Sequence, residues 1–131
     1  MEIKDKIIKK LKQMHVFDSV NFILLYGSEV NGKKTPISDI DIAVSLNLLK
    51  KERLKTRIKL SGELPEKYDI QIFEDLPLRV KISALKGKLL YCRDKEKLTL
   101  LAIQLKKDYE DFLPRYVYYI TGVKNAERAS L

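Results

Sequence analysis

The chain has 131 residues, which suits one globular domain, and its apolar content of 45% is ordinary for a protein that buries a core. It has no apolar run long enough to cross a bilayer and no apolar core of a signal peptide, so we expect a cytoplasmic protein. Cys92 is its single cysteine, so we expect no internal disulfide. The net charge of +8 favours anionic partners such as nucleotides, RNA or an acidic protein surface.

The first half of the chain predicts two helices and two strands. Residues 2–15 predict an amphipathic helix, because apolar side chains recur on one stripe between lysines. Two β-favouring runs at residues 21–27 and 39–45 predict buried strands. Residues 48–60 predict a second helix that ends near a Ser-Gly pair.

The second half continues the alternation of helices and strands. We expect a strand at residues 68–73, a short helix at 78–85 and a short strand at 89–91. Residues 94–122 predict a long final helix capped by its first residue, Asp94, and kinked or ended by Pro114. The pattern therefore predicts one α/β (α+β) domain over residues 1–131, with a small mixed sheet flanked by helices.

The most informative stretch joins the first two predicted strands. It reads Gly27-Ser28-x3-Gly32-x5-Ser38-Asp39-x-Asp41. Side chains two positions apart on a strand point to the same face, so Asp39 and Asp41 would present two carboxylates beside a Gly-Ser turn. Such a place can hold a divalent metal and a polyphosphate together, which is the chemistry of nucleotidyl transfer.

The glycines and serines of this motif suit phosphate binding. Gly27 has no Cβ, so backbone can approach a phosphate closely, and Ser28 offers a hydroxyl and an amide. Gly32 would allow a tight return toward Ser38, which would orient Asp39 or cap the turn. An ordinary turn is the alternative for each of these residues, and it is stronger for Gly32 than for Gly27.

A two-metal site normally needs a third carboxylate. Asp69 is the best candidate, because it lies on a predicted strand that can neighbour the strand of Asp41. Glu74 and Asp75 are weaker rivals, because they lie at a predicted turn.

These residues resemble the signature of the DNA polymerase β-like nucleotidyltransferase superfamily, and within it the minimal nucleotidyltransferases (MNT), often the antitoxins of HEPN/MNT pairs. The resemblance covers residues 20–75 and departs at Asn31, where many relatives carry Arg. It implies a polymerase β palm-like fold and a Mg²⁺ site, with two ions expected, at Asp39, Asp41 and Asp69, of which the last also helps to deprotonate the nucleophile. It further implies ATP as substrate and AMP transfer to an acceptor hydroxyl, such as a tyrosine of a HEPN toxin.

One competing motif fits less well. Residues 27–34 nearly match the P-loop pattern, but Lys34 stands where that motif needs the Ser or Thr that holds magnesium. The predicted strand at 39–45 also follows too soon for a full crossover helix.

Other functions remain open from the sequence. The chain would act as a non-catalytic antitoxin if it neutralised its partner by contact alone. In a third interpretation, the acceptor of the nucleotide would be RNA or a small molecule such as an aminoglycoside. Tyr116, Tyr118 and Tyr119 would form a docking surface for a partner, or would simply pack against the core.

Overall fold

The structure, a computed structural model, describes residues 2–27 and 40–121, with side chains described as far as residue 111. The predicted helices and strands are all present within these ranges, together with two short 3₁₀ turns at Phe17–Ser19 and Phe73–Asp75. In chain order the elements are α1 (Ile3–Gln13), β1 (Val20–Tyr26), β2 (Ile40–Leu46), α2 (Lys50–Glu63), β3 (Tyr68–Ile72), α3 (Leu78–Leu85), β4 (Lys88–Cys92) and α4 (Lys95–Thr121).

The strands form one mixed sheet in the order β3–β2–β1–β4. β1 pairs antiparallel with both β2 and β4, whereas β2 and β3 run parallel. Parallel neighbours need a crossover connection, and α2 supplies it here. The prediction of a small mixed sheet flanked by helices is confirmed.

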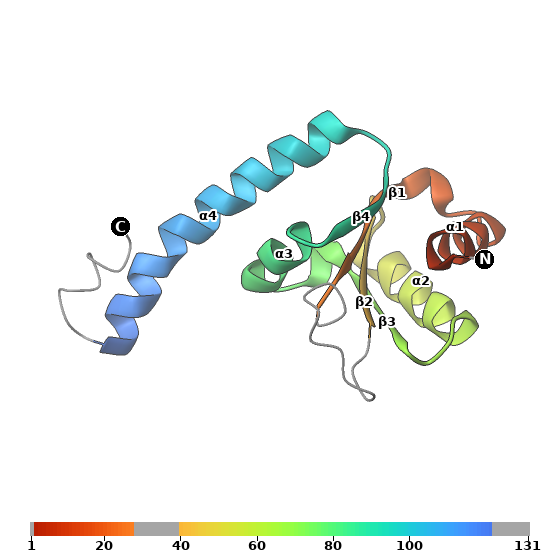
Figure 1. Cartoon of the computed structure of the whole chain (residues 1–131), viewed down its shortest axis with the longest axis horizontal. Helices are drawn as coiled ribbons and strands as arrows, with labels where there is room; N and C mark the ends of the chain where they lie inside the picture. The colour runs from red at the N-terminus through yellow and green to blue at the C-terminus, as the bar shows by residue number, and fades with distance from the viewer. Residues whose placement is uncertain (1, 28–39, 122–131) are drawn as a thin grey trace.

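Helices cover both faces of the sheet (Figure 1). α1 and α2 pack on one face, where a continuous apolar core forms between the helices and the strands. Its largest fully buried members include Ile7, Leu11, Ile23, Ile42 and Leu60. Ile23 and Ile42 reach this core because alternate residues of a strand point to the same face.

α3 and α4 lie on the opposite face, over a smaller apolar cluster. Phe22, Tyr26 and Phe73 supply its aromatic side chains, and Ala84 of α3 packs against them. Phe22 and Phe73 meet edge to face, with ring centroids 4.9 Å apart.

α4 is the longest element and extends beyond the rest of the fold (Figure 1). Asp94 caps it as expected, because one carboxylate oxygen accepts the backbone N–H groups of Glu96 and Lys97 at 3.1 and 3.2 Å. The helix continues through Pro114, so of the two expected effects of this proline, a kink or an end, the end is wrong. Proline keeps a helical φ and removes a single backbone donor, which this helix accommodates. Within the described ranges, no helix has the length and apolar character needed to span a bilayer.

Candidate active site

The end of β1 meets the start of β2 at a glycine. Gly27 has a φ of +93°, a conformation that residues with a Cβ rarely adopt. A Cβ at this position would collide with the Oδ2 atom of Asp41. Glycine is therefore required here for two reasons, the turn of the backbone and the space that the carboxylate occupies.

Two of the predicted carboxylates lie side by side at this end of the sheet. Asp41 of β2 is in register with Asp69 of β3, and Tyr26 of β1 lies opposite Asp41 on the other side. Neighbouring strands are about 4.8 Å apart, so the two aspartates occupy adjacent positions. Both are partly exposed, which leaves their oxygens accessible from solvent.

Gln71 holds the carboxylate of Asp69. Its Nε2 atom donates to both oxygens, at 3.1 and 3.2 Å. The two residues are two positions apart on β3 and therefore share a face of the sheet. The sequence analysis missed Gln71, although the same alternation that paired Asp39 with Asp41 would have placed it beside Asp69.

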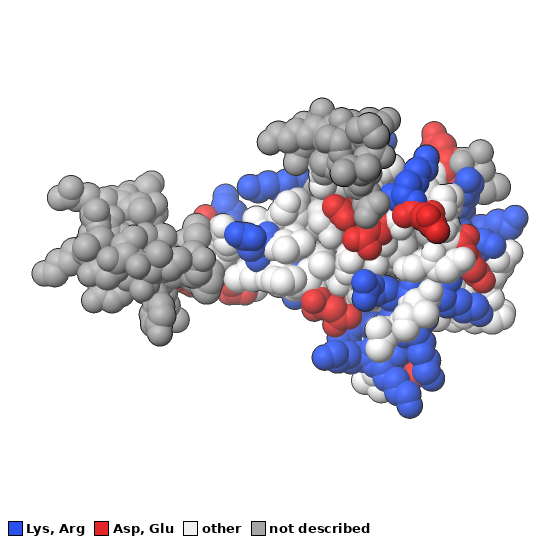
Figure 2. Space-filling model, turned by 90° about the horizontal axis from the view of Figure 1, so that it is seen from below, with Lys and Arg blue, Asp and Glu red and all other residues white. Residues whose placement is uncertain are grey.

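The site is electrically negative, because the carboxylates of Asp41 and Asp69 lie on neighbouring strands beside Tyr26. Burial, together with the smaller effects of the nearby charges of Asp41 and Asp69, raises the pKa of Tyr26 to about 12. A negative field at partly exposed carboxylates favours a cation. Figure 2 looks onto this end of the molecule and shows acidic side chains near its middle, with Lys and Arg side chains around them.

The two rival carboxylates lie elsewhere. Glu74 accepts the hydroxyl of Ser45 at 2.5 Å and the backbone N–H of Leu46 at 3.0 Å, at the opposite end of β2. Asp75 forms an ion pair with Arg53 of α2, at 2.8 Å. Both carboxylates therefore connect structural elements and are separate from Asp41.

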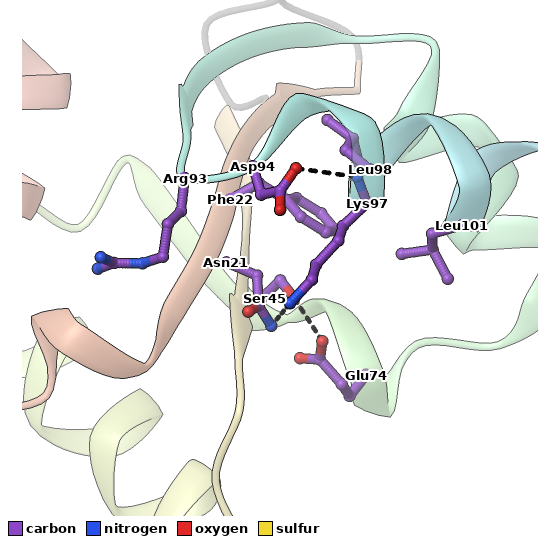
Figure 3. Close-up of a pocket in the computed structure, with 9 residues that line it drawn as sticks. All are labelled: Asn21, Phe22, Ser45, Glu74, Arg93, Asp94, Lys97, Leu98 and Leu101. Atoms are coloured by element: carbon purple, nitrogen blue, oxygen red, sulfur yellow. Dashed lines mark hydrogen bonds between the residues drawn. The ribbon is translucent and has the colours of Figure 1, made fainter.

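Glu74 also lines a pocket of about 380 Å³ at that opposite end (Figure 3). Asn21 donates to the Ser45 hydroxyl at 3.1 Å, and Ser45 donates in turn to Glu74. Arg93, also in the lining, donates to the backbone carbonyls of Phe17 and Val20. These polar groups hold strands and turns together, so the pocket does not extend the site at Asp41.

The remaining predicted site residues, Ser28, Gly32, Ser38 and Asp39, lie outside the described residues. Within residues 2–27 and 40–121, no group of three or more His, Cys, Asp or Glu side chains is placed to hold a metal ion. Asp41 and Asp69 nevertheless supply the hard oxygen ligands that Mg²⁺ prefers, commonly one or two carboxylates with the rest from water and phosphate. The donor set therefore fits magnesium.

Comparison with known proteins agrees with this geometry. Residues 5–96 match the family model described as polymerase beta nucleotidyltransferase. A relative from Methanocaldococcus jannaschii, named "Putative protein adenylyltransferase", is 37% identical over 93 residues, which cover 71% of this chain and 72% of the relative.

Solved structures share the fold. A toxin–antitoxin structure with AMP-PNP superposes with a TM-score of 0.71 at 24% identity, covering 91% of this chain and 96% of the other. A complex of a tri-AMPylated Shewanella oneidensis HEPN toxin with its MNT antitoxin gives a TM-score of 0.63 at 19% identity, covering 90% and 96%. At these identities the likeness concerns the fold alone. The family match and the archaeal relative go further: this chain belongs to the polymerase β nucleotidyltransferase family and is a nucleotidyltransferase.

Proposed function

We propose that this protein transfers AMP from ATP to a hydroxyl group of a protein partner. The observation that carries the proposal is the register of Asp41 with Asp69, beside the turn at Gly27. Further support comes from the relative named as a protein adenylyltransferase and from the neighbour solved with AMP-PNP. We propose a cytoplasmic location, because ATP is available there.

Asp39, Asp41 and Asp69 would hold magnesium, with two ions in the full site. Bound magnesium supplies charge neutralisation on the triphosphate and on the leaving pyrophosphate. Gly27 and Ser28 would bind the β- and γ-phosphates through backbone amides and the serine hydroxyl, because glycine allows a close approach. Gly32 and Ser38 would shape the return of the chain, and Ser38 would orient Asp39.

The transfer needs an in-line attack at the α-phosphorus. The acceptor oxygen forms a bond to phosphorus as the bond to the β-phosphate oxygen breaks, and pyrophosphate leaves. The proton of the acceptor hydroxyl passes to the carboxylate of Asp69, which Gln71 holds through both oxygens. Tyr26 stays protonated throughout, because its raised pKa disfavours the anion beside these carboxylates.

The acceptor that we propose is a tyrosine of a HEPN toxin, for which this chain would be the antitoxin. The neighbour in which a HEPN toxin is tri-AMPylated beside an MNT antitoxin motivates this choice. AMP added near a ribonuclease site would place negative charge where RNA binds and would repel it. The end of α4, which includes Tyr116, Tyr118 and Tyr119, would contribute to docking.

The test is to incubate the purified chain with ATP, Mg²⁺ and a small helical protein that carries an Arg-x4–6-His motif, where the neighbouring reading frame encodes one. Intact mass spectrometry should then record a gain of one or more AMP units on the partner. Asp39→Asn and Asp41→Asn should abolish the gain, and Asp69→Asn should reduce the rate more than it reduces nucleotide binding.

Asp18→Asn is the matched control, because Asp18 is an exposed acidic residue in the turn Phe17–Ser19, at the opposite end of the sheet from Asp41. This variant should transfer at the wild-type rate. Toxin inhibition that survives both Asp39→Asn and Asp41→Asn without transfer would make the chain a binding module instead. Radiolabel that moves from ATP to RNA or to an aminoglycoside, and not to the partner, would reassign the acceptor.

A further inference from the structure

The positive charge of this protein is concentrated in two helices. α1 and α2 together carry eleven Lys and Arg against three Asp and Glu, a net charge of +8. The whole chain also has a net charge of +8, so the remaining residues sum to zero. Both helices lie on the same face of the sheet (Figure 1). This layer therefore attracts acidic partners, while the rest of the molecule is balanced.

A groove runs from this layer to the edge of the sheet. It has a volume of about 640 Å³ and lies between α2 and β3, which is an edge strand. Its lining includes Lys50, Lys51, Leu54 and Arg57 from α2, and Gln71 and Ile72 from β3. The lining of the groove therefore combines two lysines and an arginine with the apolar side chains of Leu54 and Ile72.

The negative charge in this groove is already compensated. Asp75 also lines it, but Arg53 donates to both of its carboxylate oxygens, at 2.8 and 3.3 Å. The hydrogen bond from Arg53 holds the pKa of Asp75 below its usual range. Among the side chains that the structure describes, no carboxylate forms an ion pair with Lys50 or Lys51. The groove consequently presents a net positive surface to an occupant.

Exposed apolar side chains lie along the same helix. Leu54 is 52% exposed and Ile58 is 63% exposed, and the two are one turn apart on α2. A polyanion such as RNA would neutralise the lysines but would leave these side chains in water. A partner that covers both features has acidic and apolar residues on one face, as an amphipathic acidic helix does.

Two other occupants fit less well. A second copy of this chain that presented its own α2 would bring like charges together, which is unfavourable. An extended strand added to β3 would compete with Arg57, whose Nε atom already donates to the carbonyl of Ile70 at 3.0 Å. A helical segment avoids both conflicts.

The groove borders the candidate active site at one residue of the edge strand. Gln71 lines the groove and donates to both oxygens of Asp69. We propose that the groove between α2 and β3 docks an acidic amphipathic helix of the protein that accepts the nucleotide. This inference rests on the proposed function, and it assigns the acceptor's docking site to the edge of the sheet beside Asp69.

A binding experiment without ATP or magnesium tests this inference separately from catalysis. The probe is a fluorescein-labelled, helix-forming peptide with leucines four positions apart and glutamates elsewhere, measured by fluorescence anisotropy. A peptide with lysines in place of the glutamates, a single-stranded RNA of equal length and phosphatidylglycerol vesicles are compared with it. The variants are Lys50→Glu with Lys51→Glu, and Leu54→Asp. The matched control is Lys6→Glu with Lys9→Glu, which makes the same charge change on α1.

We expect the acidic peptide to bind and the Lys50→Glu/Lys51→Glu variant to weaken its binding roughly tenfold. Leu54→Asp should also weaken it, while the control on α1 should change it less than about twofold. Both substitutions in the first pair lie in the first turn of α2, where glutamate is compatible with the helix, and circular dichroism checks the fold.

Three results would overturn the inference: tighter binding of RNA or of vesicles than of the acidic peptide, an equal loss in the α1 control, or no effect of Leu54→Asp. The AMP-transfer assay then separates docking from chemistry. Lys50→Glu/Lys51→Glu should raise the KM for the protein acceptor and leave nucleotide binding unchanged. If the peptide binds as expected but no AMP is transferred, the proposed function fails while the docking site stands.

Discussion

The two faces of the sheet differ in what their side chains do. On the face toward α1 and α2 the strands contribute apolar residues such as Ile23, Ile42 and Ile70, all fully or almost fully buried. On the face toward α3 and α4, the strand ends contribute Asp41 and Asp69 instead. Neighbouring residues of one strand therefore contribute to the apolar core and to the candidate site separately, because successive side chains point in opposite directions.

The largest expected effect on stability comes from a comparison of asparagine at position 42 with asparagine at position 41, because these two residues of β2 point to opposite faces of the sheet. Ile42→Asn puts an amide into a fully buried apolar site, so we expect it to lower the free energy of unfolding by roughly 3–5 kcal/mol. Asp41→Asn should change stability by less than about 1 kcal/mol. It should lower AMP transfer by roughly two to three orders of magnitude, the range seen when a charge-stabilising group is removed.

Urea unfolding and the transfer assay measure the two effects. If Asp41→Asn proved as destabilising as Ile42→Asn, the separation of the two faces would be wrong. If Ile42→Asn folded normally but lost transfer, the apolar face would have a role in the site.

A smaller effect is expected from a methyl group at Gly27. Gly27→Ala meets the carboxylate of Asp41 and also forces alanine into a positive φ, at a cost of about 1–2 kcal/mol. Displacement of Asp41 should lower transfer up to about a hundredfold, since small misplacements of reacting groups are costly. Gly62→Ala is the control, because a Cβ there meets nothing within 4 Å and alanine favours the helix. Equal activity in the two variants would argue against the close approach at Gly27.

The charge of the active-site face should be measurable at Tyr26. Burial is the main cause of its raised pKa of about 12, and Asp41 is the next. Asp41→Asn should therefore lower this pKa part of the way toward 10, and an alkaline absorbance titration of tyrosinate would record the shift. The difference should vanish in a Tyr26→Phe background. Titration curves of Asp41→Asn that match the wild type would place Tyr26 outside the field of the carboxylates.

The smallest effect concerns the ion pair on the edge of α2. The hydrogen bond from Arg53 lowers the pKa of Asp75 in the folded protein. The ionised carboxylate therefore stabilises the fold at pH values above the pKa that Asp75 has in the unfolded chain. This contribution is lost as the pH falls through the lowered folded-state pKa. Because the carboxylate is 38% exposed, solvent screening limits the contribution to about 0.5 kcal/mol. Asp75→Asn should remove this loss of stability at low pH, and thermal melts between neutral and strongly acidic pH would test it. A dependence of melting temperature on pH that matched the wild type would argue against a stabilising ion pair between Arg53 and Asp75.

The sequence predicted the elements well because each has a clear period. The alternation of apolar and polar residues predicted a strand at Asp41, and Gly27 marked the end of β1, the strand that pairs with it. The sequence alone did not decide which strand lies beside β2, so Glu74 and Asp75 remained rivals to Asp69. Strand order puts Asp69, and neither Glu74 nor Asp75, beside Asp41 through long-range pairing, which no local pattern reports.

Other features were out of reach for the same reason. The groove depends on how α2 lies along β3, and residues far apart in the chain line it. Gln71 was within reach, since it follows Asp69 by two positions on the same strand. The effect of Pro114 was judged from local chemistry, which overestimated how firmly a proline stops a long helix.

The parallel pairing of β2 with β3 has a consequence for how this protein tolerates change. Asp41 and Asp69 are 28 positions apart, yet backbone hydrogen bonds between the strands alone fix their separation. Residues inserted between Glu63 and Tyr68 would lengthen a surface connection and leave that spacing intact. A slip of β3 by one residue would be different, because Ile70 would then face the candidate site and Asp69 would enter the apolar layer. The apolar layer therefore maintains the alignment of the two aspartates that we propose to be catalytic, since only one alignment buries the isoleucines.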